Sequence, residues 1–252
     1  MSSPNDQELI RLLNILPGDR VLDIGGSSKQ HDEIKVDTLV DIIAPEKDPY
    51  RPSKNRARKF VALDITRKTL PFKDKEFDVC LCTHTLEDLY NPFLIINEMS
   101  RVAKRGYIST PSRGKDMEFS HLNLTDWLTG FRRQPGLTHH HWFFEKKRDV
   151  MYIVEKNYPL LYTSEFQITK WTGEEEFRFP WKGNIRYTVF ESTSFHELIK
   201  EYKEFMENRS QYIKKGIATI YLDNPYYYIK ESVKFLLKRG NGFKLLSNEN
   251  LY

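Results

Sequence analysis

One short apolar run ending in two glycines, Val-Leu-Asp-Ile-Gly-Gly-Ser-Ser over residues 21–28, constrains the fold of this chain more than any other stretch. The apolar residues predict a buried parallel strand. Gly25 and Gly26 predict a loop whose backbone comes close to a bound molecule, because glycine has no Cβ to block the approach. Asp23 suits a ligand with a cationic head, since a carboxylate facing an ammonium or sulfonium group is favourable in a poorly hydrated cleft. A strand and turn without a ligand would also fit these residues.

This loop differs from the two common phosphate-binding loops. A P-loop needs a lysine followed by Ser or Thr after a final glycine, whereas Lys29 is followed by Gln30. A dinucleotide-binding loop needs a third glycine, and the residues that follow Gly26 contain none up to the next strand. The sequence therefore disfavours a nucleoside triphosphate and NAD.

Length and charge narrow the class of protein. A chain of 252 residues is long enough for one large α/β domain, or for a domain of ordinary size with an appended piece. Its net charge is +4, and its basic residues are scattered among acids, which disfavours a nucleic-acid track but allows an anionic substrate. No stretch predicts a membrane span or a secretory signal, so we expect a cytoplasmic protein. Cys80 and Cys82 are expected to be core residues of a strand.

Apolar segments predict an ordered set of strands. Residues 21–24, 35–40, 59–63, 77–81 and 106–109 predict five parallel strands, and residues 6–16 and 92–102 predict helices. Acids or small polar residues follow these strands, at the edge where open parallel sheets bind ligands. Residues 140–145 and 150–155 predict an antiparallel hairpin.

Several motifs occur along the chain in a specific order. They are Val-Leu-Asp-Ile-Gly-Gly at 21–26, Leu-Asp at 63–64, Leu-Pro-Phe-x-Asp-x-x-Phe-Asp at 70–78, His-Thr-Leu-Glu-Asp at 84–88 with Asn-Pro at 91–92, and Arg-Val-x-x-x-Gly-Tyr-Ile-x-Thr-Pro-Ser at 101–112. Together they resemble the class I S-adenosylmethionine-dependent methyltransferases over about the first two thirds of the chain. The chain departs from that family at Leu86-Glu87-Asp88, where the family often has Leu-Glu-His, and in its early second strand.

The resemblance implies a fold and a domain organisation. The expected fold is α/β, a doubly wound, mostly parallel seven-stranded sheet with an antiparallel hairpin at its end. Residues 1–158 would form the S-adenosylmethionine-binding methyltransferase domain. The aromatic-rich residues 159–252 would form a C-terminal extension that acts as a cap, a substrate-binding element or a homodimer surface.

The resemblance also implies S-adenosylmethionine as the cofactor and assigns the residues that bind it. The acid on the ribose is expected to be Asp41, at the end of the second strand, with Asp37 as its rival. The cofactor-binding residues implied in this way are Asp23 at the amino group, Gly25 and Gly26 along the methionine part, Asp41 on the ribose, Asp64 and Ile65 at the adenine, and Thr83 and His84 at the sulfonium.

Methyl transfer to oxygen also needs a group that takes the acceptor's proton, and two histidines are candidates. His84 follows the fourth strand, and His141 belongs to the run His139-His140-His141 that opens the hairpin. A core role for one of these rings is equally compatible with the sequence. No metal is expected, because a strand directs only alternate residues to one ion and no partnering acid is evident.

The expected function is methylation of an oxygen on a small molecule, such as a sugar, a glycan precursor or a phosphorylated metabolite. Two alternatives stay open. One is an RNA methyltransferase, which the basic composition and the aromatic residues favour slightly. The other is a non-catalytic binding protein that keeps the fold, against which the intact acids argue.

Overall fold

The computed structural model describes residues 4–49, 51–119, 134–163 and 165–214, so the predictions for 215–252 lie outside the described residues. Its helices are α1 (Asp6–Leu13), α2 (Phe93–Val102), α3 (Arg113–Met117), α5 (Tyr158–Leu161) and α6 (Phe195–Asn208), with 3-10 turns η1 (Gly26–Ser28), η2 (Pro45–Lys47), η3 (Leu86–Asp88) and η4 (Ser210–Tyr212). Its strands are β1 (Val21–Ile24), β2 (Thr38–Asp41), β3 (Lys59–Ala62), β4 (Phe77–Thr83), β5 (Ala103–Pro111), β6 (Trp142–Lys147), β7 (Val150–Glu155), β8 (Lys170–Trp171), β9 (Glu176–Lys182), β10 (Tyr187–Val189) and β11 (Ile213–Lys214).

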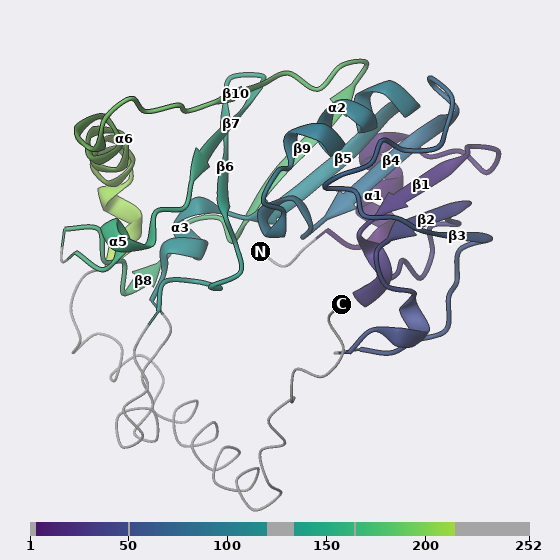
Figure 1. Ribbon diagram of the computed structural model, residues 1–252, viewed down its shortest axis with the longest axis horizontal. Coiled ribbons are helices and arrows are strands. Elements are labelled where there is room, and N and C mark those ends of the chain that lie inside the picture. Colours follow the sequence, from purple (N-terminus) through teal and green to yellow (C-terminus); the bar gives the residue numbers. More distant parts are fainter. Residues whose placement is uncertain (1–3, 50, 120–133, 164, 215–252) are drawn as a thin grey trace, which may run out of the picture.

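The central sheet is mostly parallel, as predicted, and has the strand order β3-β2-β1-β4-β5-β9 (Figure 1). The first five strands pair in parallel, and β9 runs antiparallel to β5. All four residues of β1 are buried because the sheet is covered on both faces. Val21 packs in one cluster with Leu9 of α1, whereas Leu22 packs in another with Ile96 of α2.

The predicted hairpin at the end of a seven-stranded sheet is wrong in its placement. Strands β6 and β7 pair with each other, but they form a separate three-stranded sheet with β10, and six strands make up the central sheet in the described part. The hairpin is apolar on both faces, since Phe144 packs in the cluster of the central sheet and Phe143 packs in a second cluster with α6. It therefore lies between two cores, while β9 occupies the edge of β5 (Figure 1).

The central sheet crosses the boundary expected at residue 158. Strand β9 comes from the predicted extension, and its Phe177 and Trp181 are buried in the main core. Helix α6 packs instead in the second cluster, where Tyr202 and Phe205 are buried. The functional role expected for the extension stays a prediction, but the described chain is not two units that separate at this residue. No helix in the described ranges is long and apolar enough to cross a bilayer.

Candidate functional site

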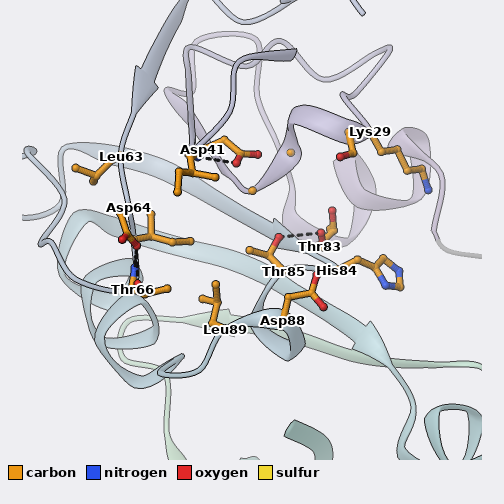
Figure 2. Close-up of a pocket in the computed structure, with 15 residues that line it drawn as sticks. Lys29, Asp41, Leu63, Asp64, Thr66, Thr83, His84, Thr85, Asp88 and Leu89 are labelled. Carbon is orange, nitrogen blue, oxygen red and sulfur yellow. Dashed lines mark hydrogen bonds between the residues drawn. The ribbon is translucent and has the colours of Figure 1, made fainter. Parts of the chain in front are cut away.

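A cavity of about 360 Å³ opens at the carboxyl edge of the central sheet, where β1 to β4 end. Parallel strands bring their carboxyl ends to one edge, so loops far apart in sequence meet there. Figure 2 shows Asp41 and Asp64 toward one end of the cavity and Thr83, His84 and Asp88 toward the other. Most of the cofactor-binding residues predicted from the sequence line it, namely Gly25, Gly26, Asp41, Asp64, Ile65, Thr83 and His84.

The two glycines of the first loop are both required by close contacts. Gly25 has φ +75°, a conformation that L side chains rarely adopt, and a Cβ there would also collide with the side chain of Thr85. Gly26 lies against the carboxylate of Asp23, which a Cβ would displace. The loop therefore keeps its backbone open toward the cavity.

The two candidate ribose acids lie at different places. Asp41 lines the cavity, and its two carboxylate oxygens accept hydrogen bonds from the backbone N–H groups of Ser27 (3.1 Å) and Ile42 (2.7 Å). Asp37 accepts a hydrogen bond from the N–H of Val21, the first residue of β1, and faces the guanidinium of Arg58 at 3.2 Å. Because Val21 lies at the amino end of β1, Asp37 is at the edge of the sheet remote from the cavity.

Asp64 is held in a fixed orientation at the adenine end predicted for the ligand. One of its carboxylate oxygens accepts hydrogen bonds from the backbone N–H (3.0 Å) and the hydroxyl (2.5 Å) of Thr66, as Figure 2 shows. The hydroxyl and the backbone N–H lower the pKa of Asp64, so its carboxylate is ionised at neutral pH and accepts hydrogen bonds only.

Asp23 lies beneath the loop and does not belong to the lining of this cavity. Its side chain is 1 % exposed, and its Oδ1 has no hydrogen-bond partner among the described residues. Burial raises the pKa of Asp23 to about 6, with the nearby Asp41 carboxylate adding to the effect and His31 opposing it. An unsatisfied buried carboxylate oxygen is costly and is expected where a ligand supplies the missing donor.

His84 is clamped between two buried carboxylates that the sequence did not predict. Its Nε2 lies 2.9 Å from Glu176 of β9, and its Nδ1 lies 3.4 Å from Glu87 of η3. The carboxylates of Glu176 and Glu87, which accept hydrogen bonds from the two ring N–H groups, raise the pKa of His84 to about 9. Its backbone has φ +51°, which is uncommon for a residue other than glycine. The ring is therefore an imidazolium at neutral pH and has no lone pair with which to accept a proton, contrary to its predicted role as a base.

His141 lies outside the cavity lining but beside the turn that closes it. Its backbone N–H donates to the carbonyl of Glu87, and its ring stacks on Tyr90 with 4.0 Å between the ring centroids. Burial, with a contribution from His140 and Lys156, lowers the pKa of His141, so this imidazole is neutral at pH 7.

Several residues that line the cavity were not predicted from the sequence. They are Ser28, Lys29, Ile42, Leu63, Thr66, Thr85, Asp88 and Leu89. Each lies within a few residues of a strand's carboxyl end, and that position is the signal that could have identified them. A second cavity of about 300 Å³ shares Lys29, Thr83 and His84 with the first, so the two form a continuous stretch along this edge.

Residues 26–109 match a family model described as "Methyltransferase domain". An uncharacterized methyltransferase of Mycobacterium sp. (strain JLS) is 30 % identical over 130 residues, which are 49 % of this chain and 46 % of the relative. Another, from Mycolicibacterium gilvum (strain PYR-GCK), is 28 % identical over 135 residues, covering 48 % and 50 % of the two chains. The match thus spans about half the length of these curated relatives.

Solved structures with similarity include an S-adenosylmethionine-dependent methyltransferase of Thermotoga maritima, titled a possible histamine N-methyltransferase. It is 22 % identical with a TM-score of 0.32, over 42 % of this chain and 51 % of the other. One from Mesorhizobium loti is 15 % identical with a TM-score of 0.34, over 54 % and 67 %. The match to the family model, which starts in the glycine loop and ends in β5, carries the assignment. Residues 26–109 therefore match a methyltransferase domain, and the class I family that the sequence motifs resemble uses S-adenosylmethionine as its cofactor.

Proposed function

We propose that this protein binds S-adenosylmethionine in the cavity at the carboxyl edge of the sheet and transfers its methyl group to an oxygen of a small molecule. The observation that carries the proposal is that residues from the ends of four strands, chosen from the sequence as cofactor ligands, line one cavity. A surface turn or a helix cap would explain any single acid among them, but not their convergence.

The nucleoside end of the ligand is assigned to Asp41, Asp64 and Ile65. A carboxylate has about four lone-pair sites, so Asp41 can accept from both ribose hydroxyls while it keeps its two backbone hydrogen bonds. Asp64 would accept from the adenine amino group, and Thr66 holds the carboxylate in place for that contact. Ile65 is 7 % exposed and offers its backbone and an apolar surface to the ring.

The methionine end is assigned to the glycine loop and Asp23. The open backbone at Gly25 and Gly26 leaves room for the chain of the ligand, and the unpartnered Oδ1 of Asp23 suits the amino group, directly or through a water molecule. A cation near Asp23 would also favour the ionised carboxylate, whose burial is otherwise uncompensated. Thr83 and His84 lie at the sulfonium end.

The bound cofactor would supply a methyl group on a positively charged sulfur. The sulfur would leave as a neutral thioether when the acceptor oxygen bonds to the methyl carbon. The protein's part is to align the acceptor, exclude water and take the acceptor's proton. We assign to His141 the role of the base that takes the acceptor's proton, because its imidazole is neutral at pH 7 and that of His84 is protonated. His84 is instead assigned a positioning role, as a cation fixed by Glu87 and Glu176.

The extension after residue 158 is proposed as a substrate element more than as a dimer surface. The contact of Glu176 with His84 supports this, because it brings a residue of the extension to the site itself. The acceptor class proposed is a sugar, a glycan precursor or a phosphorylated metabolite, and Lys29 on the cavity wall offers a charge for an anionic group.

Isothermal titration calorimetry with S-adenosylhomocysteine tests the cofactor half of the proposal. One site with micromolar or tighter affinity is expected, and no heat of binding at millimolar ligand would refute it. Release of S-adenosylhomocysteine from S-adenosylmethionine across a panel of hydroxyl-bearing metabolites, with bulk RNA as a parallel arm over a salt series, then tests the acceptor class. Turnover with RNA alone would replace the small-molecule acceptor.

A further inference from the structure

Three side chains at the rim of the cofactor cavity converge on one point. They are Asp88 of η3, which lines the cavity, and the consecutive His139 and His140, which precede β6. Both histidine Nε2 atoms lie 3.5 Å from the same carboxylate oxygen, Oδ1 of Asp88. All three atoms lie within 4.8 Å of one another.

The 3.5 Å distance from each ring nitrogen to Oδ1 of Asp88 can be compared with the distances expected for a hydrogen bond and for a shared metal ion. A hydrogen bond from a ring nitrogen to a carboxylate spans about 2.7–3.2 Å, so neither contact is a good one. Two ligands of a tetrahedral zinc ion, each about 2.0–2.2 Å from the metal, are in contrast about 3.3–3.5 Å apart. The two distances from Asp88 to the rings thus have the length of an edge of a tetrahedral site, while the two ring nitrogens lie within 4.8 Å of each other.

The ring of His140 is held in the orientation and tautomer that a metal ligand needs. Its Nδ1 lies 2.9 Å from Oδ1 of Asp116, and the other oxygen of that carboxylate pairs with the ammonium of Lys156 at 2.9 Å. Asp116 and Lys156 are both buried, so this support is rigid. The Asp116 carboxylate accepts a hydrogen bond from Nδ1–H, which leaves the lone pair on Nε2 directed at Asp88. A buried carboxylate behind a ligating histidine is the usual arrangement at zinc sites.

We infer that Asp88, His139 and His140 bind a divalent transition-metal ion, of which zinc is the best match, through one carboxylate oxygen and two imidazole nitrogens. Two nitrogens and one oxygen leave a coordination position open, as in catalytic rather than structural zinc sites. Because Asp88 also lines the cofactor cavity, an acceptor oxygen can occupy this position. That last step rests on the proposed function, whereas the metal site itself does not.

The sequence alone predicted no metal site for two reasons, and neither holds in the folded protein. His139 and His140 precede β6 and are not restricted to alternate faces of a strand. The missing acid is supplied by Asp88, which lies 51 positions before His139 in the sequence and reaches the histidines only because β6 packs against η3.

Titration of Co²⁺ into the full chain tests the site, with the protein free of any polyhistidine tag, treated with a chelator and dialysed. Co²⁺ in an approximately tetrahedral site absorbs visible light, and Zn²⁺ should displace it. We expect one ion per chain in the wild type and in His196→Ala, a control that removes an exposed histidine on α6. His139→Ala, His140→Ala and Asp88→Asn should each weaken binding at least tenfold, and Asp116→Asn should weaken it about 10–100-fold.

Circular dichroism distinguishes a variant that has unfolded from one that has lost a metal ligand. His139→Ala is the decisive variant, because the His139 side chain is 61 % exposed and its removal should leave the protein folded. Unchanged Co²⁺ affinity in a folded His139→Ala, or equal weak binding by all variants, would overturn the inference. S-adenosylhomocysteine binding is measured separately on metal-free protein. Protein that binds S-adenosylhomocysteine but no metal would contradict the metal site alone. Protein that binds the metal but no S-adenosylhomocysteine would contradict the proposed function alone.

Discussion

The imidazole of His84 lies 2.9 Å from the carboxylate of Glu176, a residue 92 positions later in the chain, on the antiparallel edge strand β9. The contact joins the loop after β4 to the part of the chain that completes the sheet. It also fixes the charge of His84, because Glu87 is the second carboxylate at the same ring.

Glu176→Gln should lower the pKa of His84 from about 9 toward its ordinary value of 6.5. Since the pKa of His84 is raised in the folded protein, its contribution to stability is complete below about pH 6.5 and is lost as pH rises toward 9. The stability difference between the wild type and His84→Gln should therefore shrink over that interval. Histidine ring NMR titration checks the pKa, and a wild-type His84 that titrates below pH 7 would contradict the assignment.

Asp41→Ala should weaken S-adenosylhomocysteine binding by on the order of 2–4 kcal/mol, the worth of two hydrogen bonds to a charged group. Asp37→Ala is the matched control, since it removes a carboxylate of similar burial from the opposite edge of the sheet. It should cost stability but leave affinity within about twofold. Calorimetry on both variants decides, and equal losses would show that the effect is not local to the cavity.

Gly25→Ala should reduce both stability and cofactor affinity, because the new methyl group meets Thr85 and the backbone is already at φ +75°. Gly183→Ala separates the two causes, since Gly183 has φ +78° but nothing within 4 Å of the added Cβ. The control should lose only about 1 kcal/mol of unfolding free energy from backbone strain. If both variants bind S-adenosylhomocysteine like the wild type, the loop does not contact the ligand.

Asp23→Asn should stabilise the unliganded protein above pH 6 while it weakens cofactor binding. The pKa of Asp23 is raised to about 6 in the folded state, so the wild type loses stability as pH rises from about 4 to 6, and the amide does not. The gain at pH 7 should be on the order of 1–3 kcal/mol, the worth of a shift of about two pKa units. Urea unfolding at pH 4 and pH 7 measures it. A variant that is less stable at both pH values would show that the carboxylate is already satisfied.

His141→Asn should lower turnover on the order of a hundredfold and remove the acidic limb of the pH profile, with little change in S-adenosylhomocysteine affinity. The reason is that a base acts in the transition state and His141 makes no contact with the cofactor cavity. His196→Asn serves as the control for loss of a histidine elsewhere. Normal turnover in His141→Asn with an intact pH profile would show that a group other than His141 takes the acceptor's proton.

The sequence was sufficient for the parts of the fold that depend on local pattern. The apolar runs placed β1 to β5, and the acid at the end of β2 proved to be the one in the cavity because strand ends and cavity edges coincide in parallel sheets.

Contacts between distant segments could not be predicted in this way. The pairing of β9 with β5 and the packing of the hairpin between two cores both join segments far apart in the chain, so they are properties of the assembled protein. The acid partner of His140 and the carboxylates around His84 are likewise brought together only by the fold. The charge on His84, and with it the choice between the two histidines, followed from these contacts.

The strand order also has a consequence for how the chain matures. Strand β9 begins 65 positions after β5 ends, at Glu176 against Pro111, so the edge of β5 stays unpaired until residue 182 has left the ribosome. A gene fragment that stops at residue 158 should therefore yield aggregated protein. Such a fragment would expose both the unpaired edge of β5 and the apolar surface that Phe177, Phe179 and Trp181 otherwise cover. The shortest fragment worth expressing ends after β9, not after the hairpin.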